Sequence, residues 1–386
     1  MRLLISTLSA SVLASILFFS SIIYGYYHHI AYAAYTRATA AHGGPTLDDP
    51  NLKVDLVVKG LDVPTSMAFL GPNDILVLEK NAGAVVRIED GELVKTPLLR
   101  VDVAQGVEYG MLGIAVAKNT NSDGSRDVFL YYTDNNGGPH NRLYKYELTS
   151  DNSQLINPKL LLDLPAISSS TTLENNNHDG GKVLIGPDNN VYTVIGDVGG
   201  HEGQAQNVNN GDPLDGTSGI FRLTRDGQPA ANNPLIGVSS SGSSSSSDHS
   251  SSSSKHGKHG KEAGTLSPAS PLLNYYYAYG IRNSFGIDFD PVTGKLWDTE
   301  NGPTFGDEIN LVNPGFNSGW SRVMGIWKAG FSAGSVIGDD TNNPPKNLVT
   351  FGGKGVYRAR ECIELLNFLG YQLLVQQRSS SSIPRS

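Results

Sequence analysis

The sequence predicts an all-β fold built as a propeller of several small sheets. Glycine is abundant, with 44 residues among 386, whereas methionine occurs only 4 times. Many glycines and few stretches that favour a helix are typical of short strands joined by tight turns. In addition, a polar turn followed by a β-rich run recurs four times along the chain. Recurrence of a unit several strands long is what propeller blades give.

The four recurring segments place Gly, Pro, Asn or Asp in a turn just before branched and aromatic residues. They are 71–78, 122–132, 186–195 and 290–297. Their starts are separated by roughly 50, 65 and 105 residues, and the last gap contains an insertion of about 30 residues. Without the insertion the spacing is about 50 to 75 residues, as for blades with long loops. The pattern leaves open a β-sandwich with coincidental turns.

The insertion covers residues 239–264. Serine fills 239–254 except at three positions, and a His-Gly-Lys repeat follows at 255–261. Such a composition cannot bury a core, so we expect a disordered loop. A metal site on its histidines is the less favoured interpretation, because a flexible segment fixes no coordination geometry.

The first 34 residues have the pattern of a secretory signal. Arg2 precedes an uncharged, largely apolar stretch over 3–27, and Ala31-Tyr32-Ala33 forms a small-x-small cleavage site. The stretch is also about long enough to span a bilayer as a helix. We therefore expect segment 1–34 to be a signal peptide or an N-terminal membrane anchor. In both cases the rest of the protein is secreted or extracytoplasmic.

Charge and cysteine content exclude several classes of function. The formal net charge is −8, which argues against a nucleic-acid partner, because phosphate binding needs a basic surface. The single cysteine, Cys362, excludes an intrachain disulfide and an all-cysteine metal cluster.

His178 and Asp197 are candidates for acid–base chemistry. His178 lies among glycine and asparagine in a loop before a predicted strand, and Asp197 ends the strand that follows the next turn. An antiparallel pairing returns Asp197 to the edge where His178 lies. A carboxylate beside an imidazole fixes its tautomer and supports its protonated form, as a general base requires. The alternative is a surface histidine with an unrelated turn aspartate.

A second group of candidates follows near residue 282. Arg282, in a setting of glycine and aromatic residues, suits an anionic or carbonyl-bearing ligand, although a salt bridge at the rim would use the same residue. Gly302-Pro303 is bracketed by acidic residues, and carbonyls with carboxylates are typical calcium ligands. An ordinary acidic turn is the alternative. The bracketing acids are Glu300, Asp307 and Glu308.

Three stretches, 108–115, 177–197 and 279–320, carry a family resemblance. From about residue 56 to 351, apart from the insertion, the chain resembles the soluble pyrroloquinoline-quinone-dependent glucose dehydrogenases and the wider glucose/sorbosone dehydrogenase family. The resemblance implies a six-bladed β-propeller over residues 50–355. It also implies that the quinone cofactor occupies a polar pocket at one end of the central channel.

The resemblance also implies roles for single residues. His178 is expected to be the general base that takes the sugar hydroxyl proton while hydride goes to the quinone, with Asp197 orienting it. Glu108 matches a substrate-pocket position that is usually glutamine in the glucose enzymes, so the preferred sugar stays open. The cofactor and metal positions are Arg282 and Asn283 for the quinone, the carbonyls of Gly302 and Pro303 for its calcium, and Asp307 and Glu308 near a second calcium.

The expected function is that of an oxidoreductase acting on an aldose or related sugar, with pyrroloquinoline quinone, calcium and an external electron acceptor. The first alternative is a non-catalytic propeller that binds sugars or other proteins. The second is a lactonase-like hydrolase, which would need more acids around the axis than this sequence offers.

The resemblance ends after Gly355. The segment 357–377 is richer in leucine than in β-branched residues, so we expect the tail 356–386 to be helical or disordered. The sequence then suffices for about five blades. A C-terminal truncation or a shifted reading frame would explain this divergence. We expect an open or poorly closed ring with weak or no quinone binding, because the family's further basic cofactor contacts have no counterparts in this tail.

Overall fold

The computed structural model describes residues 49, 51–166, 177–200, 203–207, 214–238, 271–303, 306–322 and 324. The chain divides into two units, residues 1–59 and 60–386, and every described strand lies in the second. The predicted signal or anchor (1–34), the insertion (239–264) and the divergent tail (356–386) lie outside the described residues. Within the described ranges, no helix has the length and apolar character needed to cross a membrane.

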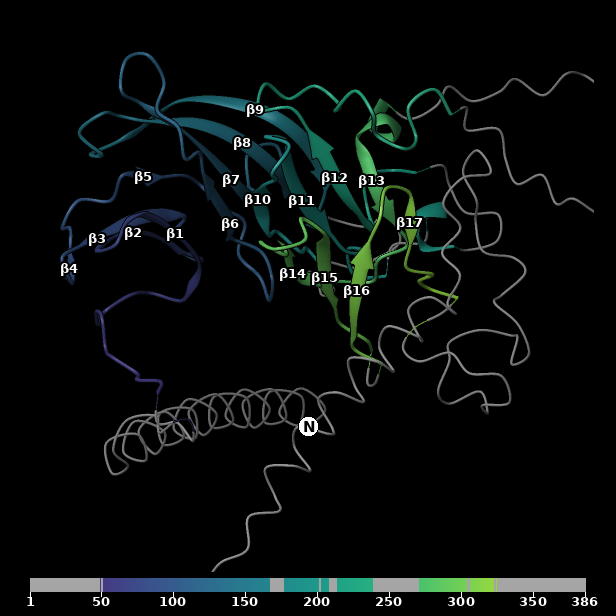
Figure 1. Cartoon of the computed structure of the whole chain (residues 1–386), viewed down its shortest axis with the longest axis horizontal. Helices are drawn as coiled ribbons and strands as arrows, with labels where there is room; N and C mark the ends of the chain where they lie inside the picture. Colours follow the sequence, from purple (N-terminus) through teal and green to yellow (C-terminus); the bar gives the residue numbers. More distant parts are fainter. Residues whose placement is uncertain are drawn as a thin grey trace, which may run out of the picture. The chain divides into compact units, whose positions relative to one another are not determined.

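The described strands form four sheets that follow one another along the chain, and we call them blades 1 to 4 (Figure 1). All pairings are antiparallel except that between β13 and β17. Blade 1 contains β1 (Pro64–Gly71), β2 (Asp74–Glu79), β3 (Ala84–Glu89), β4 (Glu92–Leu93) and β5 (Leu99–Arg100). Blade 2 contains β6 (Met111–Val116), β7 (Arg126–Asp134), β8 (His140–Leu148) and β9 (Leu155–Pro165).

Blades 3 and 4 are interleaved in sequence, because β17 returns from beyond blade 4 to pair with β13. Two short 3-10 helices, η1 (Gln204–Gln206) and η2 (Pro271–Tyr275), lie in the connections of blade 3. Blade 3 contains β10 (Val183–Ile185), β11 (Val191–Ile195), β12 (Gly219–Leu223), β13 (Tyr276–Tyr279) and β17 (Phe316–Asn317). Blade 4 contains β14 (Ser284–Phe289), β15 (Leu296–Glu300) and β16 (Glu308–Val312).

The four recurring segments of the sequence occupy equivalent places in the four blades. Each forms the turn between the first and second strands of its sheet and then the second strand itself. These second strands are β2, β7, β11 and β15. The repeat is therefore a structural repeat, and the prediction of an all-β propeller is confirmed. A two-sheet sandwich is the wrong alternative, because four sheets pack in series.

Three hydrophobic clusters join consecutive blades. Side chains alternate along each strand, so a central strand serves two clusters. On β7, Val128, Leu130 and Tyr132 pack toward blade 1, whereas Phe129 and Tyr131 pack toward blade 3. Burial on both faces explains why β7 reads as a nearly continuous apolar run.

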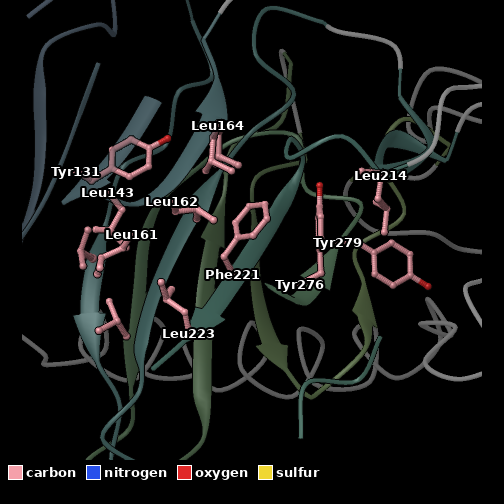
Figure 2. Packing of buried hydrophobic residues seen from close by; sticks show 14 of the residues in the cluster. Tyr131, Leu143, Leu161, Leu162, Leu164, Leu214, Phe221, Leu223, Tyr276 and Tyr279 are labelled. Atoms are coloured by element: carbon pink, nitrogen blue, oxygen red, sulfur yellow. The ribbon is translucent and has the colours of Figure 1, made fainter. Parts of the chain in front are cut away.

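The cluster between blades 2 and 3 is rich in aromatic residues (Figure 2). Phe221 and Tyr276 are both fully buried, and their ring centroids lie 4.5 Å apart. Burying a large apolar side chain contributes about 1.5–3 kcal/mol of stability. This interface therefore fixes blade 3, which carries most of the candidate site, against blade 2.

Blades 1 and 4 each have one neighbour among the described sheets. Their other faces carry exposed apolar side chains: Met67 and Phe69 on β1, Phe285 on β14 and Ile309 on β16. The described strands thus form four consecutive blades of a propeller. The remainder of the predicted five blades lies outside the described residues.

We expect Phe221→Ala to lower the free energy of unfolding by about 3–5 kcal/mol, because it removes a buried ring and leaves a cavity between two blades. Chemical denaturation followed by circular dichroism measures the loss. Phe285→Ala is the matched control, since Phe285 is 52% exposed, and it should cost under about 1 kcal/mol. Equal losses in the two variants would contradict the packing described here.

Candidate functional site

The residues singled out in the sequence gather at one end of blades 2 to 4. In an antiparallel sheet the first strand begins at the end where the second strand finishes. Glu108 and His178 precede β6 and β10, Asp197 follows β11, and Arg282 precedes β14. Strand direction therefore places each of these segments at the same end of its sheet.

His178 and Asp197 form a close pair. The imidazole Nδ1 lies 2.5 Å from Asp197 Oδ1, and both side chains are largely buried, at 12% and 2% exposed. The predicted contact is confirmed, whereas the catalytic role remains a prediction. With Nδ1 held by the carboxylate, Nε2 is the ring nitrogen left for exchange with a ligand.

Gly196 is the point where the loops of this site cross. Its amide donates to the His178 carbonyl at 3.1 Å, and the next amide, of Asp197, donates to the Arg282 carbonyl at 2.8 Å. A Cβ atom at Gly196 would lie 2.4 Å from the Arg282 oxygen and 2.7 Å from the His178 oxygen. Only glycine fits this approach, which holds the pair next to the Arg282 segment.

Glu108 stabilises the loop that carries His178, which we call the histidine loop. Its Oε2 accepts hydrogen bonds from the backbone amides of His178, at 2.6 Å, and Asp179, at 3.1 Å. His178 has a φ of 67°, in the left-handed region that is unfavourable for non-glycine residues. Lys80 holds the loop of Glu108 in turn, because its Nζ donates to the carbonyls of residues 106–107. Glu108 thus lies in the same cluster, and its contacts are with the histidine loop.

Asp179 is a buried acid that the sequence did not reveal. Its side chain is 0% exposed, and Oδ1 accepts a hydrogen bond from Asn141 Nδ2 at 2.6 Å, whereas Oδ2 has no hydrogen-bond partner. Burial raises the pKa of Asp179 to about 7, with a further contribution from the charge of Glu108, while Asn141 and Lys80 act in the opposite direction. A neutral acid therefore lies directly behind the His178 loop below about pH 7.

Arg282 lies in the same cluster as the histidine pair. Its Nη1 donates to the carbonyls of Asn301 at 3.1 Å and Gly302 at 3.2 Å, and its guanidinium carbon is 5.4 Å from the ring centroid of Trp320. Arg282 Nε and the neighbouring Asn283 Oδ1 are buried and have no hydrogen-bond partner. One buried donor and one buried acceptor, on adjacent residues, are thus left without a hydrogen-bond partner.

Of the predicted calcium residues, Gly302, Pro303 and Asp307 lie on the turn between β15 and β16, and Glu308 begins β16. Asp307 Oδ1 accepts a hydrogen bond from the Gly302 amide at 2.9 Å, which fixes the turn before Pro303. Glu308 instead faces the interior of blade 4, where its Oε2 accepts from Asn310 Nδ2 at 3.1 Å. In the described part of the chain, no three His, Cys, Asp or Glu side chains converge as metal ligands. A calcium ion here would therefore depend on backbone carbonyl oxygens as ligands. The calcium site stays a prediction.

A row of buried acids supports Arg282 from inside blade 4. Glu300 Oε1 accepts the Arg282 amide at 2.6 Å, and its Oε2 accepts the Ser318 hydroxyl at 2.5 Å. Burial raises the pKa of Glu300 well above its usual range, and the charges of Glu308 and Asp298 raise it further. Burial also raises the pKa of Asp298 to about 6. At neutral pH a proton within this row therefore reduces the repulsion between the carboxylates.

Trp320 completes the site and was not predicted individually. Its indole Nε1 donates to Asp197 Oδ2 at 2.8 Å, so both carboxylate oxygens of Asp197 are engaged. The contact joins residues 123 positions apart. A lone tryptophan after a glycine carries no local signal for such a contact, because the same residue most often fills a core.

We expect Asp179→Asn to flatten the pH dependence of stability. The folded protein holds the Asp179 proton up to about pH 7, whereas the unfolded chain releases it near pH 4. Stability is therefore greatest below pH 4 for this group and falls as the pH rises to 7, by at most about 1.4 kcal/mol per pH unit. The free energy of unfolding of the variant minus that of the wild type, measured from pH 5 to 8, should grow with pH. Asp226→Asn, at a side chain 76% exposed, should give a flat difference. A flat difference for Asp179→Asn as well would contradict the pKa shift.

The chain is similar in sequence to known sugar dehydrogenases. Quinoprotein glucose dehydrogenase B of Acinetobacter calcoaceticus is 26% identical over 304 residues, which cover 71% of this chain and 53% of that protein. Aldose sugar dehydrogenase of Escherichia coli is 25% identical over 293 residues, covering 75% of this chain and 67% of its own length. The chain thus spans between half and two thirds of the length of these relatives.

A solved structure gives the same result. The pyrroloquinoline-quinone-bound aldose sugar dehydrogenase of Streptomyces coelicolor superposes with a TM-score of 0.52 at 26% identity, over 73% of this chain and 69% of that one. The family model for glucose/sorbosone dehydrogenases matches residues 61–250 and 252–345, which include every candidate site residue. The chain belongs to the glucose/sorbosone dehydrogenase family.

Proposed function

We propose that the protein is a quinone-dependent sugar dehydrogenase that oxidises a hydroxyl of an aldose or related sugar and passes the electrons to an external acceptor. Membership in a family of sugar dehydrogenases supports an oxidoreductase acting on sugars. The observation that carries the proposal is the buried His178–Asp197 pair, placed beside Arg282 with one imidazole nitrogen free of the carboxylate.

The residues present fit pyrroloquinoline quinone. The cofactor carries carboxylates and carbonyls, which need donors, and one pyrrole N–H, which needs an acceptor. Arg282 Nε and Asn283 Oδ1 are an unsatisfied donor and an unsatisfied acceptor, and the guanidinium supplies the matching positive charge. When bound, the quinone supplies a two-electron acceptor for the hydride of the sugar. Arg282 and Asn283 are the residues that would hold it.

Calcium fits the neighbouring turn. The carbonyls of Gly302 and Pro303 are hard oxygen donors, as calcium prefers. The Gly302 carbonyl accepts one hydrogen bond, from Arg282, which leaves its second lone pair for a cation. Asp307 supports this turn through the Gly302 amide and adds negative charge beside it. Glu308 is proposed to have an indirect effect on the site: its charge raises the pKa of Glu300, which accepts the Arg282 amide.

In the proposed reaction, His178 Nε2 takes the proton of the sugar hydroxyl as hydride leaves the same carbon. Asp197 accepts the Nδ1–H and stabilises the imidazolium that forms. Glu108 holds the loop in the conformation that presents the ring, through the amides of His178 and Asp179. The sugar thus loses one hydride and one proton, and an aldose becomes its lactone.

We further propose that the protein works outside the cytoplasm, either secreted or attached to a membrane by its N-terminal segment. The basic Arg2, the uncharged stretch 3–27 and the site at Ala31-Tyr32-Ala33 support this location.

We expect His178→Gln to lower kcat with an aldose by about 10²–10⁴-fold, because the substitution removes the base but keeps a polar side chain of similar size. Dye reduction measures the rate in protein reconstituted with the quinone and calcium, over a panel of aldoses. Cofactor absorbance should show that the variant still binds the quinone.

The matched control is His140→Gln. His140 also pairs with an aspartate, Asp163, at 2.8 Å, but this pair is about 40% exposed on blade 2. It should keep the full rate. Undiminished turnover in His178→Gln would refute the assignment of the base. A wild-type protein that reduces no dye with any aldose would favour the non-catalytic alternative.

A further inference from the structure

Trp320 is the one side chain of the described site that contacts both the histidine pair and the Arg282 group. Its indole Nε1 donates to Asp197 Oδ2 at 2.8 Å. The face of the same ring lies 5.4 Å from the guanidinium carbon of Arg282. The proposed base and the proposed cofactor ligand are therefore connected through one rigid aromatic ring.

Asp197 depends on this donor because its carboxylate is buried, with 2% of the side chain exposed. Oδ1 accepts from His178 and from the Gly200 amide at 3.3 Å, and Oδ2 accepts from the indole. A buried carboxylate oxygen that loses its donor is costly, since no water replaces the hydrogen bond. Without the indole, the carboxylate would rotate or admit water, and both changes alter its contact with the imidazole.

The backbone of Trp320 is held by two buried side-chain amides and by one backbone carbonyl. Asn207 and Asn317 exchange reciprocal side-chain hydrogen bonds, at 2.9 and 2.7 Å, and Asn207 Nδ2 also donates to the Trp320 carbonyl at 2.8 Å. The Trp320 amide donates to the Gly280 carbonyl at 2.9 Å. These partners come from the connection after β11, from β17 and from the segment after β13. Three separate parts of blade 3 thus fix the backbone from which the indole projects, and the ring itself contacts Asp197 and Arg282.

Opposite charges surround the ring in a defined order. The anionic Asp197 lies at the N–H edge, where the ring is positive, and the cationic Arg282 lies over the face, where the quadrupole is negative. Both contacts favour the same orientation of the indole. A tryptophan that merely filled space would need neither contact.

We propose that Trp320 is a positioning residue for the dehydrogenase reaction proposed above. It holds Asp197 Oδ1 toward His178 and aligns the Arg282 guanidinium, so that the base and the cofactor ligand keep a fixed relation. The inference rests on the proposed function for its catalytic consequence, but its structural part concerns the cofactor-free protein alone.

The first experiment examines the hydrogen bond without any cofactor. The chain contains three tryptophans, Trp297, Trp320 and Trp327, and their indole N–H resonances can be followed in full-length protein labelled with ¹⁵N-tryptophan. The variant Trp320→Phe assigns its own resonance by deletion. We expect Asp197→Asn to move the Trp320 N–H resonance upfield, because a neutral amide oxygen is a weaker acceptor than a carboxylate. The Trp297 resonance should stay in place.

The second experiment measures catalysis in protein reconstituted with quinone and calcium. Trp320→Phe keeps an aromatic ring over Arg282 but removes the donor to Asp197, so we expect kcat to fall roughly 10- to 100-fold, the effect of losing a hydrogen bond to a charged group. The KM for the aldose should change little, because the indole is proposed to act through Asp197. Trp297→Phe makes the same change on β15, with a partly buried side chain, and should keep the wild-type rate.

An unmoved Trp320 resonance in Asp197→Asn would overturn the inference, as would equal kcat values for Trp320→Phe and Trp297→Phe. If the Trp320 resonance moves in Asp197→Asn but the reconstituted wild-type protein shows no turnover, the structural contact is supported and the proposed function is defeated. If Trp320→Phe fails to fold, the variants Trp297→Phe and Trp327→Phe assign the other two resonances and so identify that of Trp320 by elimination. The Asp197→Asn measurement then still tests whether the indole donates to Asp197.

Discussion

The buried carboxylate of Asp197 is the constraint around which the candidate site is organised. A charge removed from water is stable only where several donors replace the lost hydration. Asp197 obtains them from His178, from the Gly200 amide and from the Trp320 indole. These donors belong to three chain segments, so the carboxylate can be accommodated only when those segments meet. The same geometry leaves His178 Nε2 as the free end of a polarised pair.

Blade packing makes this convergence rigid. The three clusters between neighbouring blades use alternate residues of the same strands, so a shift of blade 2 or blade 3 would disturb both of its neighbours. Blade 3 is enclosed on both faces and supplies β11 and β17, which lead into Asp197 and Trp320. Blade 4 supplies Arg282 and supports it with Glu300. The chemistry therefore lies on loops, while the strands determine where the loops end.

Local patterns predicted an all-β chain and the turn at the start of each second strand. They left the propeller and the His178–Asp197 contact each beside one alternative, and the family resemblance favoured both. These features depend on short-range periodicity and on the return of an antiparallel strand to its own edge. The substrate-pocket role of Glu108, which the family resemblance implies, stays a prediction. Its contacts with the amides of the histidine loop were not expected, because a carboxylate that accepts backbone amides has no sequence signature. The calcium ligands and the arrangement after residue 324 stay predictions.

The contacts that sequence reasoning missed are long-range and buried. Trp320 meets Asp197 across 123 positions, and Asn207 meets Asn317 across 110. Asp179 follows the predicted base directly, yet its raised pKa comes mainly from its complete burial, with a further contribution from the charge of Glu108. Burial of a polar group depends on how the blades assemble, so neither the charge nor the periodicity of a single segment predicts it.

Transfer of hydride from a sugar carbon, with His178 taking the hydroxyl proton, is tested most directly by single-turnover reduction of the bound quinone. Protein reconstituted with quinone and calcium should bleach the oxidised cofactor when an aldose is added, and deuterium at the reacting carbon should slow this step severalfold. A cofactor that stays oxidised with every aldose, or one that is reduced at the same rate by the protiated and deuterated sugars, would contradict the account.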